Sequence, residues 1–204
     1  MRARLTNAGH VQVVSGTLRL YHGEPPDLLV THTGSFAAAP AGTLIFDGLK
    51  SDFAVSSSFD ISGTVSFVNG AAGTVRGAFD GPGLTFVNAA ALHFERPDGA
   101  VTLTHLNLGG SSRLRGTNDI TVTGVLTMSG WGAVVEGSSS NTNPLNIAPG
   151  AMLRLEQSGG LSFRTLNNHG SFEQATGQQF FMINDAIFNN GPTGVYTVSR
   201  GGLG

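Results

Sequence analysis

The stretch LNNHGSF, Leu166–Phe172, decides the fold of this chain because its order of residue types recurs. An apolar residue, any residue and then an asparagine also occur at Leu5–Asn7 in LTNAGHV and at Phe188–Asn190 in FNNGPTG. An asparagine that closes a single turn has no reason to return in the same apolar frame. We therefore interpret the frame as the marker of a structural period.

The spacing of the asparagines that end this frame predicts the length of the repeat. The five are Asn7, Asn69, Asn88, Asn168 and Asn190. The gaps between them are 62, 19, 80 and 22 residues. These gaps are close to three, one, four and one times a period of about 20 residues, the low end for stacked repeats. The alternative is a set of independent loop asparagines, each closing its own turn. The recurrence of the preceding apolar residue favours the repeat.

Apolar and polar residues alternate along most of the chain, as in HVQVVSGTLRLY (10–21) and DITVTGVLTM (119–128). This alternation predicts half-buried strands, and Gly, Asn, Ser or Pro separate them at short intervals. Short strands also build sandwiches and barrels, but repetition at about 20 residues favours stacked coils of three strands each. We therefore predict an all-β chain, a right-handed parallel β-helix of roughly ten turns, forming a single domain over residues 1–204.

In such a coil the recurrent asparagine has a physical role. At a bend it tolerates the left-handed backbone region, and its amide can hydrogen-bond to an equivalent amide one turn away. We expect the five asparagines to form a structural ladder, with Asn168 stacked on Asn190 and Asn69 on Asn88. The glycine that follows, Gly170 in the opening stretch, is expected to bend the chain through a positive φ.

The composition narrows the classes of function. The chain has 204 residues with 30 Gly, no Cys, 12% charged residues and a formal net charge of −2. A net charge near zero argues against a general nucleic-acid binder or a polybasic membrane anchor. The absence of Cys excludes disulfides and thiolate metal sites. No run of 18 apolar residues occurs, so we expect no membrane-spanning helix, and we do not interpret the start as a signal peptide.

Four aspartates, Asp47, Asp52, Asp60 and Asp80, are the candidates for acid/base chemistry on a polysaccharide, because successive turns could bring some of them together. Their contexts, such as FDG and FDI, are typical of bends or outward strand positions. The motifs of pectin-degrading β-helix enzymes are not recognisable. We therefore predict no catalytic residues, no enzymatic activity and no cofactor.

Residue patterns in the sequence offer candidates for metal, ice and sugar binding. His22 with Glu24, in YHGE, is the nearest candidate for a metal, but a solvent-exposed strand end is the favoured interpretation and we predict no metal site. Thr-x-Thr pairs of the kind that bind ice occur at Thr31/Thr33, Thr102/Thr104 and Thr121/Thr123. Only the second and third are spaced for neighbouring turns, so ice binding is not favoured. Trp131 is a candidate for an exposed sugar-stacking ring or an inter-subunit contact, and burial at a corner is the alternative.

One segment points to a family. The residues GTNDITVTGVLTMSGWGAVVEG (Gly116–Gly137), followed by RTLNNHGSF and DAIFNNGPTGVYTV, resemble the repeat units of very large bacterial surface and secreted β-strand-repeat proteins. These units are similar in style to those of filamentous-haemagglutinin-like adhesins and autotransporter passengers. The resemblance covers nearly the whole chain, and its motifs are structural. It implies a right-handed parallel β-helix outside the cell and brings no catalytic residues.

Both ends of the chain lie inside the repeating pattern, and neither carries an obvious capping element. Because uncapped terminal turns are adhesive edges, we expect either an excerpt of a longer solenoid or head-to-tail stacking into an open filament. The expected end-to-end contacts are Leu5, Tyr21, Tyr196, Val198 and Leu203.

The predicted function is that of a structural or adhesive extracellular β-solenoid in a surface fibre. Its expected partners are further copies of itself or like repeats, together with surface glycans. The alternative is a carbohydrate-binding or carbohydrate-cleaving β-helix, which would show a cleft with clustered acids and exposed aromatic rings.

Overall fold

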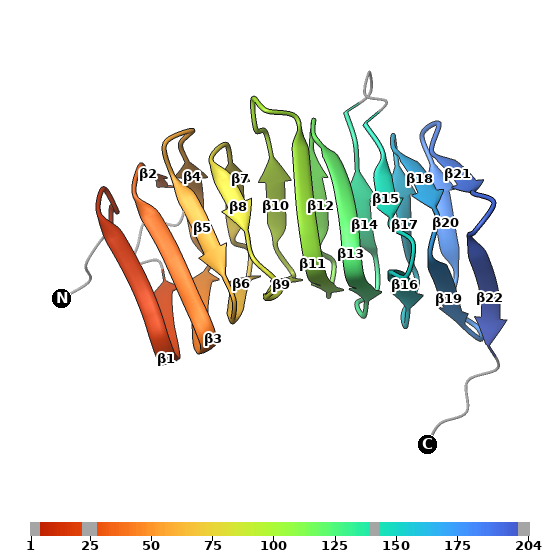
Figure 1. Cartoon of the computed structure of the whole chain (residues 1–204), viewed down its shortest axis with the longest axis horizontal. Helices are drawn as coiled ribbons and strands as arrows, with labels where there is room; N and C mark the ends of the chain where they lie inside the picture. The colour runs from red at the N-terminus through yellow and green to blue at the C-terminus, as the bar shows by residue number, and fades with distance from the viewer. Residues whose placement is uncertain (1–4, 22–27, 139–142, 200–204) are drawn as a thin grey trace.

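The structure, a computed structural model, describes residues 5–21, 28–138 and 143–199, and these form 22 strands and no helix (Figure 1). In chain order the strands are β1 (His10–Tyr21), β2 (Leu29–His32), β3 (Ser35–Asp47), β4 (Lys50–Phe53), β5 (Ser58–Ile61), β6 (Thr64–Val68), β7 (Ala72–Val75), β8 (Ala78–Asp80), β9 (Leu84–Asn88), β10 (Ala91–Phe94), β11 (Ala100–Gly109), β12 (Arg113–Gly116), β13 (Asp119–Met128), β14 (Ala133–Glu136), β15 (Leu145–Ile147), β16 (Met152–Leu155), β17 (Gly159–Ser162), β18 (Thr165–Asn168), β19 (Ser171–Ala175), β20 (Phe180–Ile183), β21 (Ile187–Asn190) and β22 (Val195–Ser199). Three residues named above, His22, Glu24 and Leu203, lie outside the described residues.

All pairings among these strands are parallel, and they build three faces of a rod. The first face contains β5, β8, β15, β18 and β21, and the second contains β6, β9, β16, β19 and β22. The long strands β1, β3, β11 and β13 bend across both of these faces. The third face contains β2, β4, β7, β10, β12, β14, β17 and β20.

The chain winds through these faces in about nine turns of roughly 21 residues each. Leu44, Val65 and Thr85, for example, are register partners in three successive turns. The colour in Figure 1 accordingly advances from one end of the rod to the other. The predicted all-β parallel solenoid is therefore confirmed, with a turn close to the expected length.

The inward positions of the strands form one apolar core that runs along the rod. In the first turns this core is aromatic: Phe46 stacks on Phe67 of the next turn with ring centroids 5.0 Å apart, and Phe36 stacks on Phe59 at 5.3 Å. All four rings are at most 1% exposed. Burial of one such side chain stabilises the fold by about 1.5–3 kcal/mol. The abundance of Phe in a chain with few other aromatic residues follows from this stack.

The expected pairing of Asn69 with Asn88 is wrong by one residue. Asn88 lies opposite Val68, so the partner of Asn69 is Ala89. The equivalent corner residues in four successive turns are Gly48, Asn69, Ala89 and Gly110, with φ of 64°, 56°, 49° and 56°. Asn69 therefore adopts the left-handed backbone conformation found at this corner in each of these turns. Its Nδ2 donates to Asp47 Oδ1 at 2.8 Å and not to Asn88.

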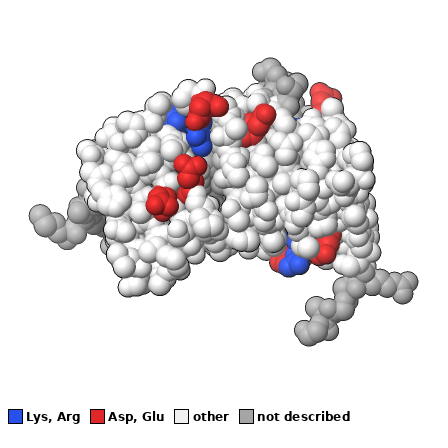
Figure 2. Space-filling view, in the orientation of Figure 1, with Lys and Arg blue, Asp and Glu red and all other residues white. Residues whose placement is uncertain are grey.

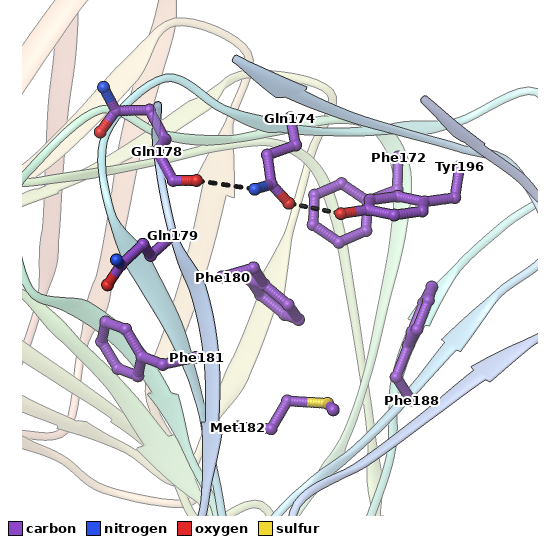
Figure 3. A pocket seen from close by; sticks show the side chains of 9 residues that line it. All are labelled: Phe172, Gln174, Gln178, Gln179, Phe180, Phe181, Met182, Phe188 and Tyr196. Atoms are coloured by element: carbon purple, nitrogen blue, oxygen red, sulfur yellow. Dashed lines mark hydrogen bonds between the residues drawn. The ribbon is translucent and has the colours of Figure 1, made fainter. Parts of the chain in front are cut away.

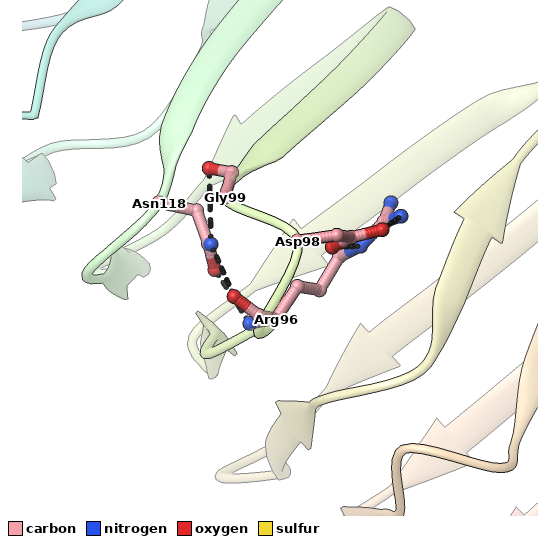
Figure 4. Close-up of polar contacts among 4 residues, drawn as sticks. All are labelled: Arg96, Asp98, Gly99 and Asn118. Atoms are coloured by element: carbon pink, nitrogen blue, oxygen red, sulfur yellow. Dashed lines mark hydrogen bonds and ion pairs between the residues drawn. The ribbon is translucent and has the colours of Figure 1, made fainter.

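The ladder of the first face is interrupted in the middle of the rod. Among the described strands β8 pairs only with β5, and the first half of β11 pairs only with β13. The loop before β11 is held instead by the side chain of Asn118 (Figure 4). Its Oδ1 accepts from Arg96 N at 2.7 Å, and its Nδ2 donates to Arg96 O at 2.8 Å and Gly99 O at 3.1 Å. A buried side chain thus supplies hydrogen bonds that the main-chain ladder lacks here.

Candidate functional site

The asparagines of the opening stretch stack as the sequence predicts. Asn168 and Asn190 are register partners, and Asn168 Nδ2 donates to Asn190 Oδ1 at 2.8 Å. Asn168 is fully buried, and the same Nδ2 contacts Val195 O at 3.1 Å. This part of the ladder prediction is confirmed.

The role expected for Gly170 is wrong. Its φ is not in the left-handed region. A Cβ at this position would instead overlap the carbonyl oxygens of Ala148 and Ala151 in the preceding turn. The glycine is required because two turns of backbone approach closely, not because of its own conformation.

A second ladder of asparagines runs along the outer side of the first face. Asn189 Nδ2 donates to Asn167 Oδ1 at 3.0 Å, and Asn167 Nδ2 donates to Asn146 Oδ1 at 2.9 Å. Thr121 and Thr102 continue the same row in the two preceding turns. The sequence signal for this second ladder was the Asn-Asn dipeptide at 167–168 and 189–190. The apolar-x-Asn frame uses only the second asparagine of each dipeptide, so it did not predict a ladder of the first ones. The row also changes from Thr to Asn, so a Thr array of the ice-binding kind does not continue.

Asn7 does not join either ladder. It precedes β1, is 5% exposed, and donates from Nδ2 to Ser35 O at 2.8 Å while its Oδ1 accepts from Gly9 N at 3.0 Å. Its backbone N donates to Nδ1 of the buried His32 at 3.2 Å. Burial lowers the pKa of His32 to about 4, although Asp52 acts in the opposite direction. Asn7 therefore closes the first turn onto the second.

The four candidate aspartates lie in three separate places. Asp47 forms an ion pair with Arg19 at 2.5 Å, and Asp52 forms one with Arg76. Only Asp60 and Asp80 come together, as exposed register partners on the first face. A pair of carboxylates open to water does not form a cleft that could hold a sugar ring and tune proton transfer.

Charged side chains are sparse on much of the rod. Figure 2 shows a face on which a few acidic and basic residues stand among uncharged ones. The third face carries small ion-pair groups, in which Arg76 bridges Asp52 and Glu95, and Glu136 joins Arg113 and Arg115. Exposed pairs of this kind contribute at most about 1 kcal/mol each.

The described part of the chain contains no group of three His, Asp or Glu side chains that could hold a metal ion. Residues 5–21, 28–138 and 143–199 include no helix long and apolar enough to cross a membrane. Trp131 is 67% exposed, so the alternative of a buried corner residue is wrong.

The C-terminal end of the rod is the most distinctive surface. Tyr196 and Val198 of β22 are register partners of Phe172 and Gln174 and occupy inward, core-type positions. Phe172 is 1% exposed, whereas Tyr196 is 45% and Val198 58% exposed. β21 and β22 each pair with one neighbour only among the described strands. The core therefore reaches the end of the described chain without being covered.

A cavity of about 510 Å³ lies at this end (Figure 3). Its lining residues are Phe172, Gln174, Gln178, Gln179, Phe180, Phe181, Met182, Phe188 and Tyr196. Tyr196 Oη donates to Gln174 Oε1 at 2.5 Å, and Gln174 Nε2 donates to Gln178 O at 2.7 Å. Aromatic rings and amides of this kind can receive apolar side chains.

The N-terminal end differs in the residues that it presents. β1 pairs only with β3 among the described strands, and its inward residues Val11, Leu18 and Leu20 are half-buried. Tyr21 is 64% exposed but lies opposite Asp47, on the outer side of the second face. Leu5, at 41% exposed, precedes β1. Of the expected end contacts, Tyr196 and Val198 thus lie at an open core edge, while Tyr21 points away from the rod.

No protein-family model, curated protein or solved structure matches this chain. Function is therefore inferred from the geometry of its own residues.

Proposed function

We propose that this chain is a structural and adhesive rod of an extracellular surface fibre, and that it works by stacking turns rather than by chemistry. The observation that carries the proposal is the last described turn, where no further described strand pairs with β22 and inward residues such as Tyr196 and Val198 are half-exposed. An edge of this kind pairs readily with a further parallel turn. Because such a contact joins two different surfaces, it extends the rod instead of closing it.

The interior supports a mechanical role. Main-chain hydrogen bonds connect each turn to the next on the second and third faces, and on the first face except between β8 and β11, and the apolar core is continuous from Phe36 to Phe172. Strand pairing joins each turn to its neighbours, so length can be added without a new core. The outer rows of Thr and Asn give a weakly charged surface suited to hydrogen-bonded contacts outside a cell.

Glycan binding is the second candidate, and the exposed ring of Trp131 is the observation that favours it. An indole face can stack on a sugar ring. A glycan panel tests this function on the intact chain and on Trp131→Ala. Binding that is lost in the variant would support it, and release of shorter sugars by the intact chain would contradict the prediction that the chain is not an enzyme.

The fibre function is tested by electron microscopy and light scattering of the purified chain over a range of concentrations. We expect rods whose length grows with concentration. Uniform monomers at high concentration would rule out assembly by stacking. Antibody labelling of intact source cells tests the extracellular location, which we expect to be stained without permeabilisation.

A further inference from the structure

The two ends of the rod match in strand direction and length. The C-terminal edge runs from Ile187 to Ser199 across the first and second faces, in β21 and β22. The N-terminal edge is β1, His10–Tyr21, which bends across the same two faces. A second copy displaced along the rod axis would therefore bring its β1 parallel to β21 and β22.

Inward positions determine the register of such a contact. On the C-terminal edge they are Phe188 and Asn190 on the first face and Tyr196 and Val198 on the second. On β1 they are Val11 and Val13, followed by Leu18 and Leu20. Matching inward to inward places Val11 over Phe188, Val13 over Asn190, Leu18 over Tyr196 and Leu20 over Val198. A shift of one residue would turn each of these apolar side chains toward solvent, so the register is strongly specified.

An independent feature agrees with this register. The outer amide ladder of Asn146, Asn167 and Asn189 ends at Asn189, whose Oδ1 accepts no hydrogen bond among the described residues. Asn189 and Asn167 each donate Nδ2 to the Oδ1 of the asparagine in the preceding turn. The register that places Val11 over Phe188 places Gln12 over Asn189. Gln12 is an exposed amide on the outer side of β1, so its Nε2 can donate to Asn189 Oδ1 and extend the ladder.

We infer that the C-terminal turn of one copy binds the N-terminal turn of a second copy in this register, with Gln12 extending the Asn146–Asn167–Asn189 ladder across the junction. The inference rests on the proposed function and makes it more specific, because it names the partner and the residues in contact. Half-exposed Tyr196 and Val198 become core residues at each junction.

Disulfide trapping tests the register directly, since the natural chain has no cysteine. Neighbouring parallel strands lie about 4.8 Å apart, within the Cα separation that a disulfide spans. Gln12→Cys is mixed with Asn189→Cys under mild oxidation, and we expect a covalent dimer. Asp60→Cys replaces Asn189→Cys in the matched control, because Asp60 is exposed on the same face but lies between β3 and β8, away from the C-terminal edge. No covalent dimer is expected there.

The outcomes separate this inference from the fibre function. Rods without the Gln12–Asn189 cross-link, or with equal cross-linking in the control, would overturn the inferred junction and leave the fibre intact. Absence of both rods and cross-link would overturn both. A specific cross-link supports both.

Blocking variants test the polarity of the junction. Tyr196→Asp places a charge in the junction core and should raise the concentration needed for assembly at least about tenfold, because a buried unpaired charge costs more than 1.4 kcal/mol. Thr197→Asp, the outward neighbour on β22, is the matched control and should change it far less. Leu18→Asp blocks the other end. A mixture of Tyr196→Asp and Leu18→Asp should form dimers but no rods, and rods from this mixture would overturn the inferred polarity.

Discussion

Asn168 and Asn190 lie 22 residues apart in the chain, yet their side-chain amides are joined by a 2.8 Å hydrogen bond between successive turns. Asn168 is completely buried, and its Nδ2 also bonds to the carbonyl oxygen of Val195. One side chain therefore holds two strands of the last turn to the turn before it.

Replacing Asn168 should destabilise the C-terminal turn. Asn168→Ala leaves acceptors on Asn190 and Val195 without their donor, and we expect a loss of about 1–3 kcal/mol. Urea unfolding midpoints measure it. Asn189→Ala, which removes an exposed rung of the outer ladder, is the control and should cost less than about 1 kcal/mol. Equal losses of stability in the two variants would show that the buried amide of Asn168 contributes no more to stability than the exposed amide of Asn189.

Gly170 should not tolerate a side chain. Gly170→Ala would push a Cβ into the carbonyl oxygens of Ala148 and Ala151, and we expect a loss of roughly 1–3 kcal/mol from overpacking. Gly9→Ala is the matched control, because nothing lies within 4 Å of its Cβ and its φ is not positive. Thermal unfolding compares the two, and an unchanged midpoint in Gly170→Ala would contradict the close approach.

Arg164 joins turns that are distant in sequence. Its guanidinium is buried and donates to Gly116 O at 2.7 Å and Asn118 O at 3.2 Å. Burial lowers its pKa to about 10, so the group stays charged at neutral pH. Arg164→Met should cost about 1.5–3 kcal/mol, as expected for hydrogen bonds to a charged donor.

The matched control for Arg164 is Arg154→Met on the second face. Arg154 is 45% exposed and lies 3.5 Å from Glu173, so its loss should cost under about 1 kcal/mol. Denaturant unfolding of both variants compares the stability lost at the two positions. A larger effect at Arg154 would show that the buried guanidinium does not hold the corner.

His32 should make the rod sensitive to acid. Its pKa falls from 6.5 to about 4 because the folded core disfavours the charged ring. Between these values the unfolded chain binds a proton that the folded chain does not, so stability decreases as the pH falls below 6.5 and the effect levels off near 4. The full difference is on the order of 3 kcal/mol.

Unfolding measured at pH 7 and at pH 4 tests this effect. The variant His32→Phe is expected to lose less stability over this range, since Phe53 and Phe36 already surround the ring. His93, whose pKa burial also lowers, stays in both proteins and cancels in the comparison. An identical pH profile in the variant would rule out His32 as the source.

The repeat and the inward positions could be predicted because they depend on local order of residue types. Alternation at Val11 or Phe36 is enough to place a side chain inside, since strand side chains alternate with a period of two. The pairing of Asn168 with Asn190 followed from equal spacing within adjacent turns. Tyr196 was predicted as an end contact from its place in the chain; its side chain is 45% exposed, and the contact itself stays a prediction.

The register of individual turns could not be predicted in the same way. The turn between Asn69 and Asn88 differs by one residue from the spacing that would pair them, and a slip of one residue exchanges inward and outward positions. The outer row of Asn146, Asn167 and Asn189 and the contacts of Asn118 depend on this register, so they emerged only from the structure.

By itself, the sequence determined that the chain is a stack of parallel turns. Alternating apolar residues that recur at a constant period are all buried when each turn stacks on the one before it. The tertiary structure decided which amides meet, where the ladder breaks at Asn118 and how Arg164 reaches back to Gly116. These contacts join residues that are far apart in sequence. Their geometry depends on the length of every intervening corner, which no local pattern encodes.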